Sequence, residues 1–290
     1  MRTMDQYNPV ALTVYFLLVS GMAMFCMDPV ILVLSLAGAL IFCFVQKGLN
    51  GGKMHGYAFL VFVISALINP LVSHRGATVL FVMNHNPVTL EAFLYGLTAA
   101  TMIVAVLYWF HLFSLLMTSD KLLYVFGGIS PKLALMLSMT LRYVPLFGKQ
   151  MRKVAQAQKA LGLYKEDNII DSFRGGLRVF SVMVTWTLEN GIITADSMTA
   201  RGYGTGRRSR YSIFRWRKGD YIFLFLSILL FALSLHGAML RDFVFYPVVS
   251  AAQVDLPVAI GYAAYALLVL LPTIIWGKEA LKWRLLISRM

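Results

Sequence analysis

Long apolar segments constrain the fold of this chain more than any other feature. A helix needs about 20 mostly apolar residues to cross a hydrocarbon layer about 30 Å thick. Only 13% of the 290 residues are charged, against about a quarter in soluble domains, and 59% are hydrophobic. We therefore predict an all-α integral membrane protein with about six transmembrane helices. The predicted spans are residues 11–26, 30–45, 57–72, 90–117, 221–239 and 257–276.

Positive charge is concentrated between the fourth and fifth predicted spans. From Arg142 to Lys218 there are 15 Lys or Arg and five acidic residues, so this stretch carries +10 of the net charge of +13. Cytoplasmic segments of membrane proteins are enriched in Lys and Arg, which places this stretch in the cytoplasm. If this stretch is cytoplasmic and the chain crosses the membrane six times, both termini are also cytoplasmic. Of the 26 basic residues, Arg75 and Arg241 alone then lie outside.

The same pattern divides the chain into three parts. Residues 1–117 are predicted to form N-terminal transmembrane helices, residues 118–219 a cytoplasmic or interfacial region, and residues 220–290 C-terminal transmembrane helices with a cytoplasmic tail. Within the middle part, residues 131–162 and 173–202 each combine an apolar stripe with interspersed charges. We expect both to be long helices that lie at or below the membrane surface and project into the cytoplasm.

The ends of these two predicted helices are alike, because each has a basic residue in its last turn and then a glycine. Lys159 precedes Gly162, and Arg201 precedes Gly202. Glycine is the usual left-handed helix cap, and a cation near a helix C-terminus stabilises the helix by about 0.3–1 kcal/mol. Taken alone, Arg201-Gly202 is therefore simplest to interpret as a cap. The nearby glycines do not form a nucleotide-binding motif, since G-x-x-x-x-G-K-[ST] is absent.

Motifs for catalysis and metal binding are absent from the sequence. The five histidines are scattered, and neither H-E-x-x-H nor a paired-carboxylate motif occurs in a span. His74 and His85 share one predicted outer loop, and Cys26 and Cys43 are interpreted as small buried side chains. Ionisable groups are nearly absent from the spans, which argues against an ion-coupled carrier. We predict no catalytic site, no cofactor, no metal site and no nucleic-acid partner.

Three segments carry a resemblance to a known family. "INPLVSHRGATVLF", "SDKLLYVFGGISPKLALMLSMTLRYVPLF" and "ADSMTARGYGTGRRSRY", in this order, resemble the transmembrane T component of energy-coupling factor (ECF) transporters, the vitamin and metal importers of prokaryotes. The likeness runs from about Pro9 to the sixth span. It implies a non-catalytic scaffold in the plasma membrane that holds two ABC-type ATPase subunits and a small substrate-binding membrane subunit, the S subunit. ATP-driven closing of the ATPases would move two cytoplasmic coupling helices and so tip the S subunit.

The resemblance also implies which residues dock the ATPases, because each coupling helix of the family ends in a short motif with a central arginine. "ARG" matches that motif on the second helix, and "ALG" stands at the matching place on the first. Leu161 departs from the family pattern, which leaves two explanations: Lys159 or Lys165 replaces the arginine, or the two ATPases are not identical. The expected docking residues are Lys159, Ala160, Leu161 and Gly162 on the first helix and Ala200, Arg201 and Gly202 on the second.

Two other functions are compatible with a multi-pass chain. A self-sufficient secondary transporter or channel would transport when reconstituted alone, whereas a T component would not. An intramembrane enzyme would need converging nucleophile and base groups, which the sequence does not offer. The transported substrate is not encoded in any motif of this chain, because in ECF transporters specificity lies in the S subunit.

Overall fold

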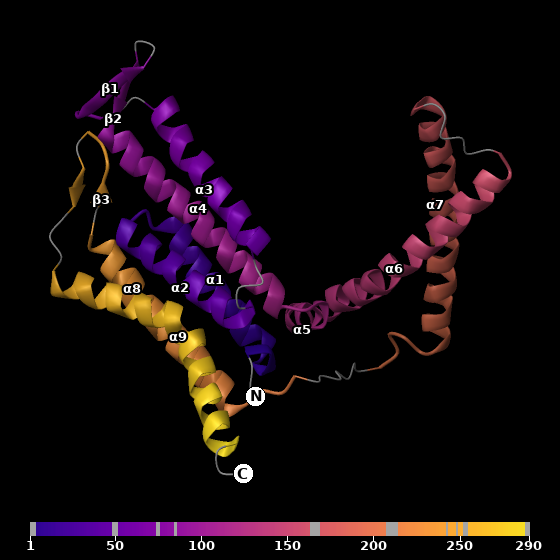
Figure 1. Ribbon diagram of the computed structural model, residues 1–290. Helices are drawn as coiled ribbons and strands as arrows, with labels where there is room; N and C mark the ends of the chain where they lie inside the picture. Colours follow the sequence, from indigo (N-terminus) through magenta and orange to yellow (C-terminus); the bar gives the residue numbers. More distant parts are fainter. Residues whose placement is uncertain are drawn as a thin grey trace. The chain divides into compact units, whose positions relative to one another are not determined.

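The structure is a computed structural model that describes residues 4–47, 52–73, 76–83, 86–162, 169–206, 214–241, 243–247, 249–251 and 255–287. The chain forms two compact units (Figure 1). The first unit, here the membrane unit, combines Met1–Thr118 with Phe214–Met290, and the second unit is Ser119–Ile213. The membrane unit is therefore assembled from two parts of the chain that are separated by the whole second unit.

Helices make up most of the membrane unit. Within the described residues, five of them are long and apolar enough to cross a membrane, and a further helix, α1, has 17 residues and a length of about 25 Å, at the lower limit for a span. The prediction of an all-α membrane protein is confirmed. After the short 3₁₀ helix η1 (Met4–Gln6), the helices are α1 (Pro9–Phe25), α2 (Pro29–Lys47), α3 (Gly52–Val72), α4 (Leu90–Leu116), α8 (Lys218–Met239) and α9 (Leu256–Ile287).

Local sequence explains where two of these helices begin. The side chain of Asn8 accepts a hydrogen bond from the Val10 amide at 3.0 Å, and Pro9 occupies the first helical position. Thr89 caps α4 in the same way, through a bond of 3.3 Å from the Ala92 amide. Both caps satisfy amide groups that would otherwise lack a partner at a helix end.

The core of the membrane unit joins its two parts. Helix α1 packs against α4 and α8, and α2 packs against α4 and α9. The fully buried Trp109 donates from Nε1 to Ser35 Oγ at 3.0 Å, which links α4 to α2. Tyr15 donates from its hydroxyl to the Leu268 carbonyl at 3.2 Å, which links α1 to α9. The Trp109 bond fixes α4 against α2 within the N-terminal part, and the Tyr15 bond fixes that part against α9.

Glycines allow close contact between helices of this unit. A Cβ atom on Gly237 of α8 would lie 2.7 Å from the Cα atom of Gly261 on α9. A Cβ atom on Gly38 of α2 would lie 1.7 Å from Val269 Cγ1, also on α9. Small residues at such crossings are typical of membrane helices, which associate mainly through close packing.

Two short hairpins lie in the α3–α4 and α8–α9 connections, and the membrane unit also contains a buried ion pair. Strand β1 (Val79–Met83) pairs antiparallel with β2 (Asn86–Thr89), and β3 (Phe243–Val244) pairs with β4 (Ser250–Ala251). The sequence analysis did not predict these strands. Arg241 lies 3.6 Å from the Asp28 carboxylate, and both bond to the hydroxyl of Tyr262. About nine-tenths of each charged side chain is buried, so Asp28 neutralises one of the two basic residues predicted to lie outside.

The second unit consists of α5 (Ser119–Ile129), α6 (Pro131–Ala160) and α7 (Ile169–Ala200). The two long helices predicted for residues 131–162 and 173–202 are thus present as α6 and α7, although α7 begins four residues earlier than predicted. Helix α5 packs on α6, and α6 packs on α7.

Candidate functional site

The candidate site is the pair of long helices α6 and α7, which cross (Figure 1). On one side of the crossing Tyr143 and Thr194 bond at 2.7 Å; Thr194 donates its own proton to the Asn190 carbonyl, so Tyr143 is the donor. Next to this bond, the rings of Phe147 and Trp186 meet edge to face with centroids 5.6 Å apart. The two helices are therefore joined by side chains from the middle of α6 and from the second half of α7.

Both helices carry apolar surface that the described residues of the second unit leave uncovered. Helix α6 has no buried residue. On α7, large apolar side chains recur every three or four residues along one face, and each is more than half exposed except Val184, which is 40% exposed. Such a face is not stable in water, so it requires lipid or a protein partner. The exposed residues of this α7 face are Ile170, Phe173, Leu177, Phe180, Val184 and Leu188.

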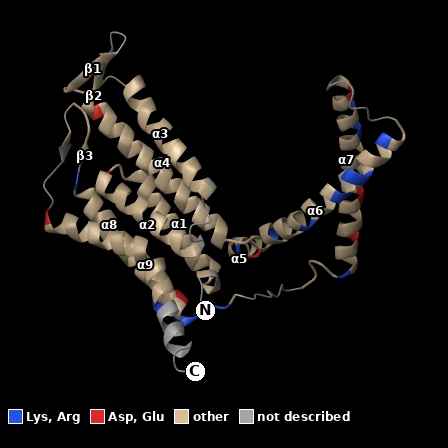
Figure 2. Cartoon of the chain, in the orientation of Figure 1, with Lys and Arg blue, Asp and Glu red and all other residues tan. Residues whose placement is uncertain are grey.

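Charge is distributed differently in the two units, as Figure 2 shows. Helix α1 has no charged residue, and α4 has one, Glu91 in its first turn. Helix α6 instead carries six basic residues and no acidic one, and it has Lys159 in its last turn. A surface of this kind attracts an acidic partner. The basic residues of α6 are Lys132, Arg142, Lys149, Arg152, Lys153 and Lys159.

Helix α7 ends in a left-handed glycine cap. Gly202 has a φ of +77°, and its amide donates to the Thr199 carbonyl at 2.9 Å. The amide of Tyr203 donates to the Met198 carbonyl at 3.0 Å, which completes a Schellman motif. Arg201 is the residue just before the glycine, and its side chain is exposed. Within the described part of the chain, no hydrogen bond or ion pair holds its guanidinium group.

Helix α6 ends in the same way. Gly162 has a φ of +69°, and its amide donates to the Lys159 carbonyl at 3.0 Å. Leu161 occupies the cap position that Arg201 occupies on α7, and 73% of its surface is exposed. The two tripeptides thus present unlike side chains from equivalent backbone positions. One expectation needs correction: Lys159 lies in the last turn of α6, but Arg201 lies one residue beyond α7 because that helix ends at Ala200.

The two helix ends cannot meet at one site. Helix α7 has 32 residues and is about 48 Å long. The seven residue steps from Gly162 to Ile169 reach at most about 25 Å. The end of α7 therefore lies at least about 20 Å from the end of α6. The predicted docking residues therefore form two groups, residues 159–162 at the end of α6 and residues 200–202 at the end of α7, and the two groups lie apart. Lys165, an alternative docking residue, lies outside the described residues.

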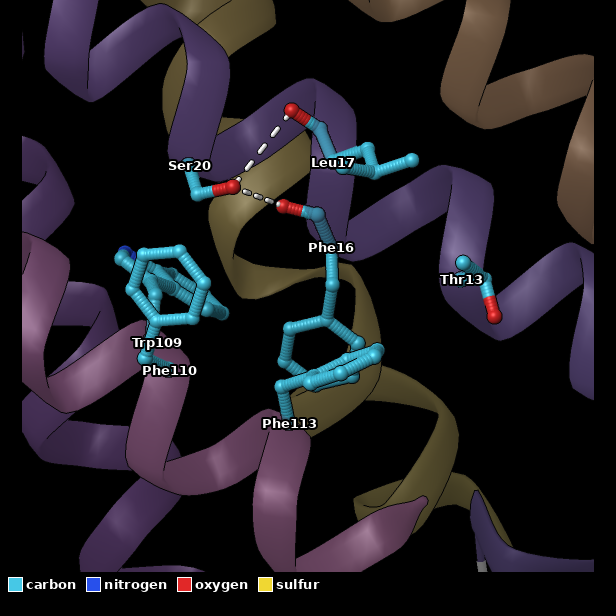
Figure 3. A pocket seen from close by; sticks show the side chains of 7 residues that line it. All are labelled: Thr13, Phe16, Leu17, Ser20, Trp109, Phe110 and Phe113. Atoms are coloured by element: carbon cyan, nitrogen blue, oxygen red, sulfur yellow. Dashed lines mark hydrogen bonds between the residues drawn. The ribbon is translucent and has the colours of Figure 1, made fainter. Parts of the chain in front are cut away.

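A small cavity between α1 and α4 offers little to a substrate (Figure 3). Its volume of about 60 Å³ is well below the roughly 300–1,000 Å³ of small-molecule sites. Its two hydroxyl groups already donate to carbonyls of their own helix, Thr13 to Pro9 at 2.8 Å and Ser20 to Phe16 at 2.6 Å. The cavity is lined by Thr13, Phe16, Leu17, Ser20, Trp109, Phe110 and Phe113.

Metal-ligating side chains do not converge in the described part of the chain. Among those residues, no three His, Cys, Asp or Glu lie together as a metal site would require. Cys43 is buried and Cys26 is partly buried, and neither forms a disulfide within the described residues. His74 and His85, which share a loop in the sequence, lie outside the described residues.

Comparison with known proteins points to one family. The family model described as CbiQ, cobalt transport protein, matches residues 2–213. The "energy-coupling factor transporter transmembrane protein EcfT 1" of Listeria monocytogenes serotype 1/2a is 33% identical over 102 residues, which are 34% of this chain and 38% of that protein. EcfT of Lactobacillus helveticus is 30% identical over 117 residues, 40% of this chain and 42% of that protein. EcfT of Streptococcus thermophilus is 31% identical over 120 residues, 39% and 46% respectively, so less than half of each relative is matched.

Proposed function

Because this chain belongs to the CbiQ family of cobalt transport proteins, whose model matches residues 2–213, we propose that it is the T component of an ECF transporter. It is a multi-pass membrane protein of bacteria. In the proposed complex it is a non-catalytic scaffold: two partner ABC-type ATPases hydrolyse ATP, and an S subunit binds a vitamin or another micronutrient. The chain mechanically couples ATP hydrolysis by the ATPases to movement of the S subunit.

The observation that carries this proposal is the pair of equivalent helix ends in the second unit. Each end has a left-handed glycine that fixes its backbone, and each exposes the side chain before that glycine, Leu161 on α6 and Arg201 on α7. The ends lie at least about 20 Å apart, so they suit two separate partner subunits rather than one binding groove. In the proposed docks Ala160 and Ala200 are small enough for close approach, and Lys159 adds a cation beside Leu161.

Chemistry distinguishes the two docks. Arg201 is always charged and can form two parallel bonds with a carboxylate, so its partner surface should present an acidic side chain. Leu161 can only make apolar contacts, so its partner surface should be an apolar pocket. Unlike docks of this kind fit two non-identical ATPases.

The apolar surface of α7 supports a place for the S subunit. An exposed apolar face that runs from Ile170 to Leu188 is about 28 Å long and has no cover within the described residues of the second unit. We assign this face to the membrane-embedded S subunit and the surrounding lipid. The same two helices would then contact the ATPases at their ends and the S subunit along their length.

The proposed topology follows from charge and keeps the predicted division of the chain. Residues 1–117 and 220–290 form the membrane helices, and residues 118–219 form the coupling region on the cytoplasmic side together with both termini. It is tested by maleimide labelling of single cysteines in intact cells, with Asn86→Cys reacting from outside and Lys165→Cys reacting only after lysis. The reverse pattern would end both the topology and the coupling proposal.

The decisive experiment is purification of the tagged chain from native membranes, with identification of every bound subunit. The proposal expects two ABC-type ATPases and at least one small membrane subunit, and ATP-dependent uptake by vesicles that contain the whole complex. Transport by the chain alone, without ATPases, would contradict the proposal and indicate a secondary transporter or channel.

A further inference from the structure

The hairpin β1–β2 is an apolar projection at the end of α3 and α4 (Figure 1). Its side chains Val79, Leu80 and Val82 are 54%, 54% and 65% exposed. From Gly76 to Leu90 the sequence contains no Asp, Glu, Lys or Arg. Soluble surfaces seldom expose a continuous apolar run such as Val79–Met83, so this hairpin requires a partner.

The base of the hairpin is held firmly against α4. Thr78 donates to the Glu91 carboxylate from its amide at 3.2 Å and from its hydroxyl at 2.7 Å. Gly76 has a φ of +147°, and a Cβ atom there would lie 2.5 Å from Glu91 Oε2, so glycine is required. The Ala77 amide donates to the Pro247 carbonyl at 3.1 Å, which adds a tie to the loop after α8. The exposed side chains are therefore presented from a fixed position.

The apolar surface of the hairpin continues the surface of the membrane-spanning helices. Near the end of α3, Leu71 and Val72 are 53% and 73% exposed, and at the start of α4, Leu90 and Phe93 are 40% and 43% exposed. Helix α4 has 27 residues and is about 40 Å long, which exceeds the hydrocarbon thickness of about 30 Å and matches that of the bilayer with its headgroup zones. The hairpin, which directly precedes α4, therefore begins at headgroup level.

The backbone of the hairpin sets a limit on its depth. Among the described residues this sheet has two strands, so each strand has an outer edge whose amide and carbonyl groups have no partner strand. Such edges do not occur in hydrocarbon, where no water can satisfy them. Exposed valine and leucine side chains, in turn, are unfavourable in bulk water. The zone that satisfies both requirements is the interface between headgroups and acyl chains.

We infer that the β1–β2 hairpin is an interfacial anchor whose partner is the lipid surface of the leaflet that the end of α3 reaches. This is the outer leaflet in the proposed topology, but the inference does not depend on the proposed function. The anchor fixes the depth and tilt of the α3–α4 pair, because Thr78 and Glu91 connect the hairpin rigidly to α4.

The test uses the full chain in phosphatidylcholine vesicles with an environment-sensitive NBD probe at single cysteines. Cys26 and Cys43 are replaced by alanine, and Leu80→Cys and Val82→Cys carry the probe at the hairpin. Leu60→Cys, on the exposed face of α3, is the hydrocarbon reference. Free NBD-cysteine in buffer is the water reference. Quenching by nitroxide-labelled lipids compares a label near the headgroup with a label deep in the acyl chains.

For both hairpin positions we expect emission blue-shifted from the water reference and several-fold stronger quenching by the shallow label than by the deep one. The probe at residue 60 should show the opposite order. Water-like emission at both hairpin positions would overturn the inference, as would stronger quenching by the deep label. A blue shift that arises only when partner subunits are bound and that lipid labels do not quench would replace lipid by a protein partner. Both substituted side chains are more than half exposed, so the fold should tolerate the changes.

Discussion

Replacing Arg201 by alanine separates two roles for the end of α7. Arg201 lies at the cap position, its side chain is exposed, and the described chain gives its guanidinium no hydrogen-bond or ion-pair partner. The cap bonds of this helix end are made by backbone groups of Gly202 and Tyr203, which the substitution leaves in place. Within the isolated chain, Arg201→Ala therefore removes only the interaction with the helix dipole.

The two roles predict effects of different size. Loss of the dipole interaction costs about 0.3–1 kcal/mol, which lowers the melting temperature by at most a few degrees. Loss of a desolvated ion pair with an ATPase carboxylate costs about 2–5 kcal/mol. That cost corresponds to a roughly 30- to 4,000-fold weaker association. Arg174→Ala is a matched control, because Arg174 is an exposed arginine in the first turns of the same helix.

The assay combines pull-down of the ATPases, ATP-dependent uptake in vesicles and thermal unfolding of the isolated chain. For Arg201→Ala we expect strongly reduced ATPase binding and uptake with a nearly unchanged melting temperature, and for Arg174→Ala little change in any of the three. Retained binding and uptake in Arg201→Ala would refute the docking role and leave Arg201 as a helix-capping residue. Equal losses in both variants would show that general positive charge, and not this position, attracts the ATPases.

Three further predictions concern other contacts of the chain. Leu161→Asp should prevent docking of one ATPase while Leu161→Met is tolerated; pull-downs in which both variants behave alike would contradict the apolar dock. Asp28→Asn or Arg241→Gln alone should each destabilise the membrane unit by about 3–5 kcal/mol, because each leaves one buried charge without its partner. The double variant should lose less than the sum of the two. Losses that add in thermal unfolding would refute an interaction between Asp28 and Arg241. Gly237→Ala should cost about 1–3 kcal/mol through its clash with α9, whereas Gly21→Ala, which meets no atom within 4 Å, should be neutral or slightly stabilising in the same measurement.

The helices could be predicted from the sequence because their signals are local. The apolar window at residues 90–117 coincides with α4 within one residue, and the window at residues 11–26 lies within two residues of α1. The family, too, was identified correctly from three short segments. Helix α8 begins three residues before its predicted start, because the Asp220 carboxylate accepts a hydrogen bond from the Arg217 amide and so stabilises a polar first turn.

Contacts between distant residues could not be predicted in this way. Arg241 pairs with Asp28 across more than 200 residues, and neither residue signals the other in the sequence. Strand β1 escaped prediction because a run of consecutive apolar residues lacks the alternation that marks a half-buried strand. For the candidate site, the sequence indicated the two capped helix ends but not the side-chain contacts at which α6 and α7 cross.

That crossing gives the proposed coupling a physical route. The contacts of Phe147 with Trp186 and of Tyr143 with Thr194 join the middle of α6 to the second half of α7. A displacement of either helix end by a bound ATPase would therefore act on the other helix through these contacts. Pro145 lies between Tyr143 and Phe147 and removes one backbone hydrogen bond from α6, so this helix bends most easily where the two helices touch. Under the proposed function, motion at the two docks converges on this crossing, beside the apolar face that we assign to the S subunit.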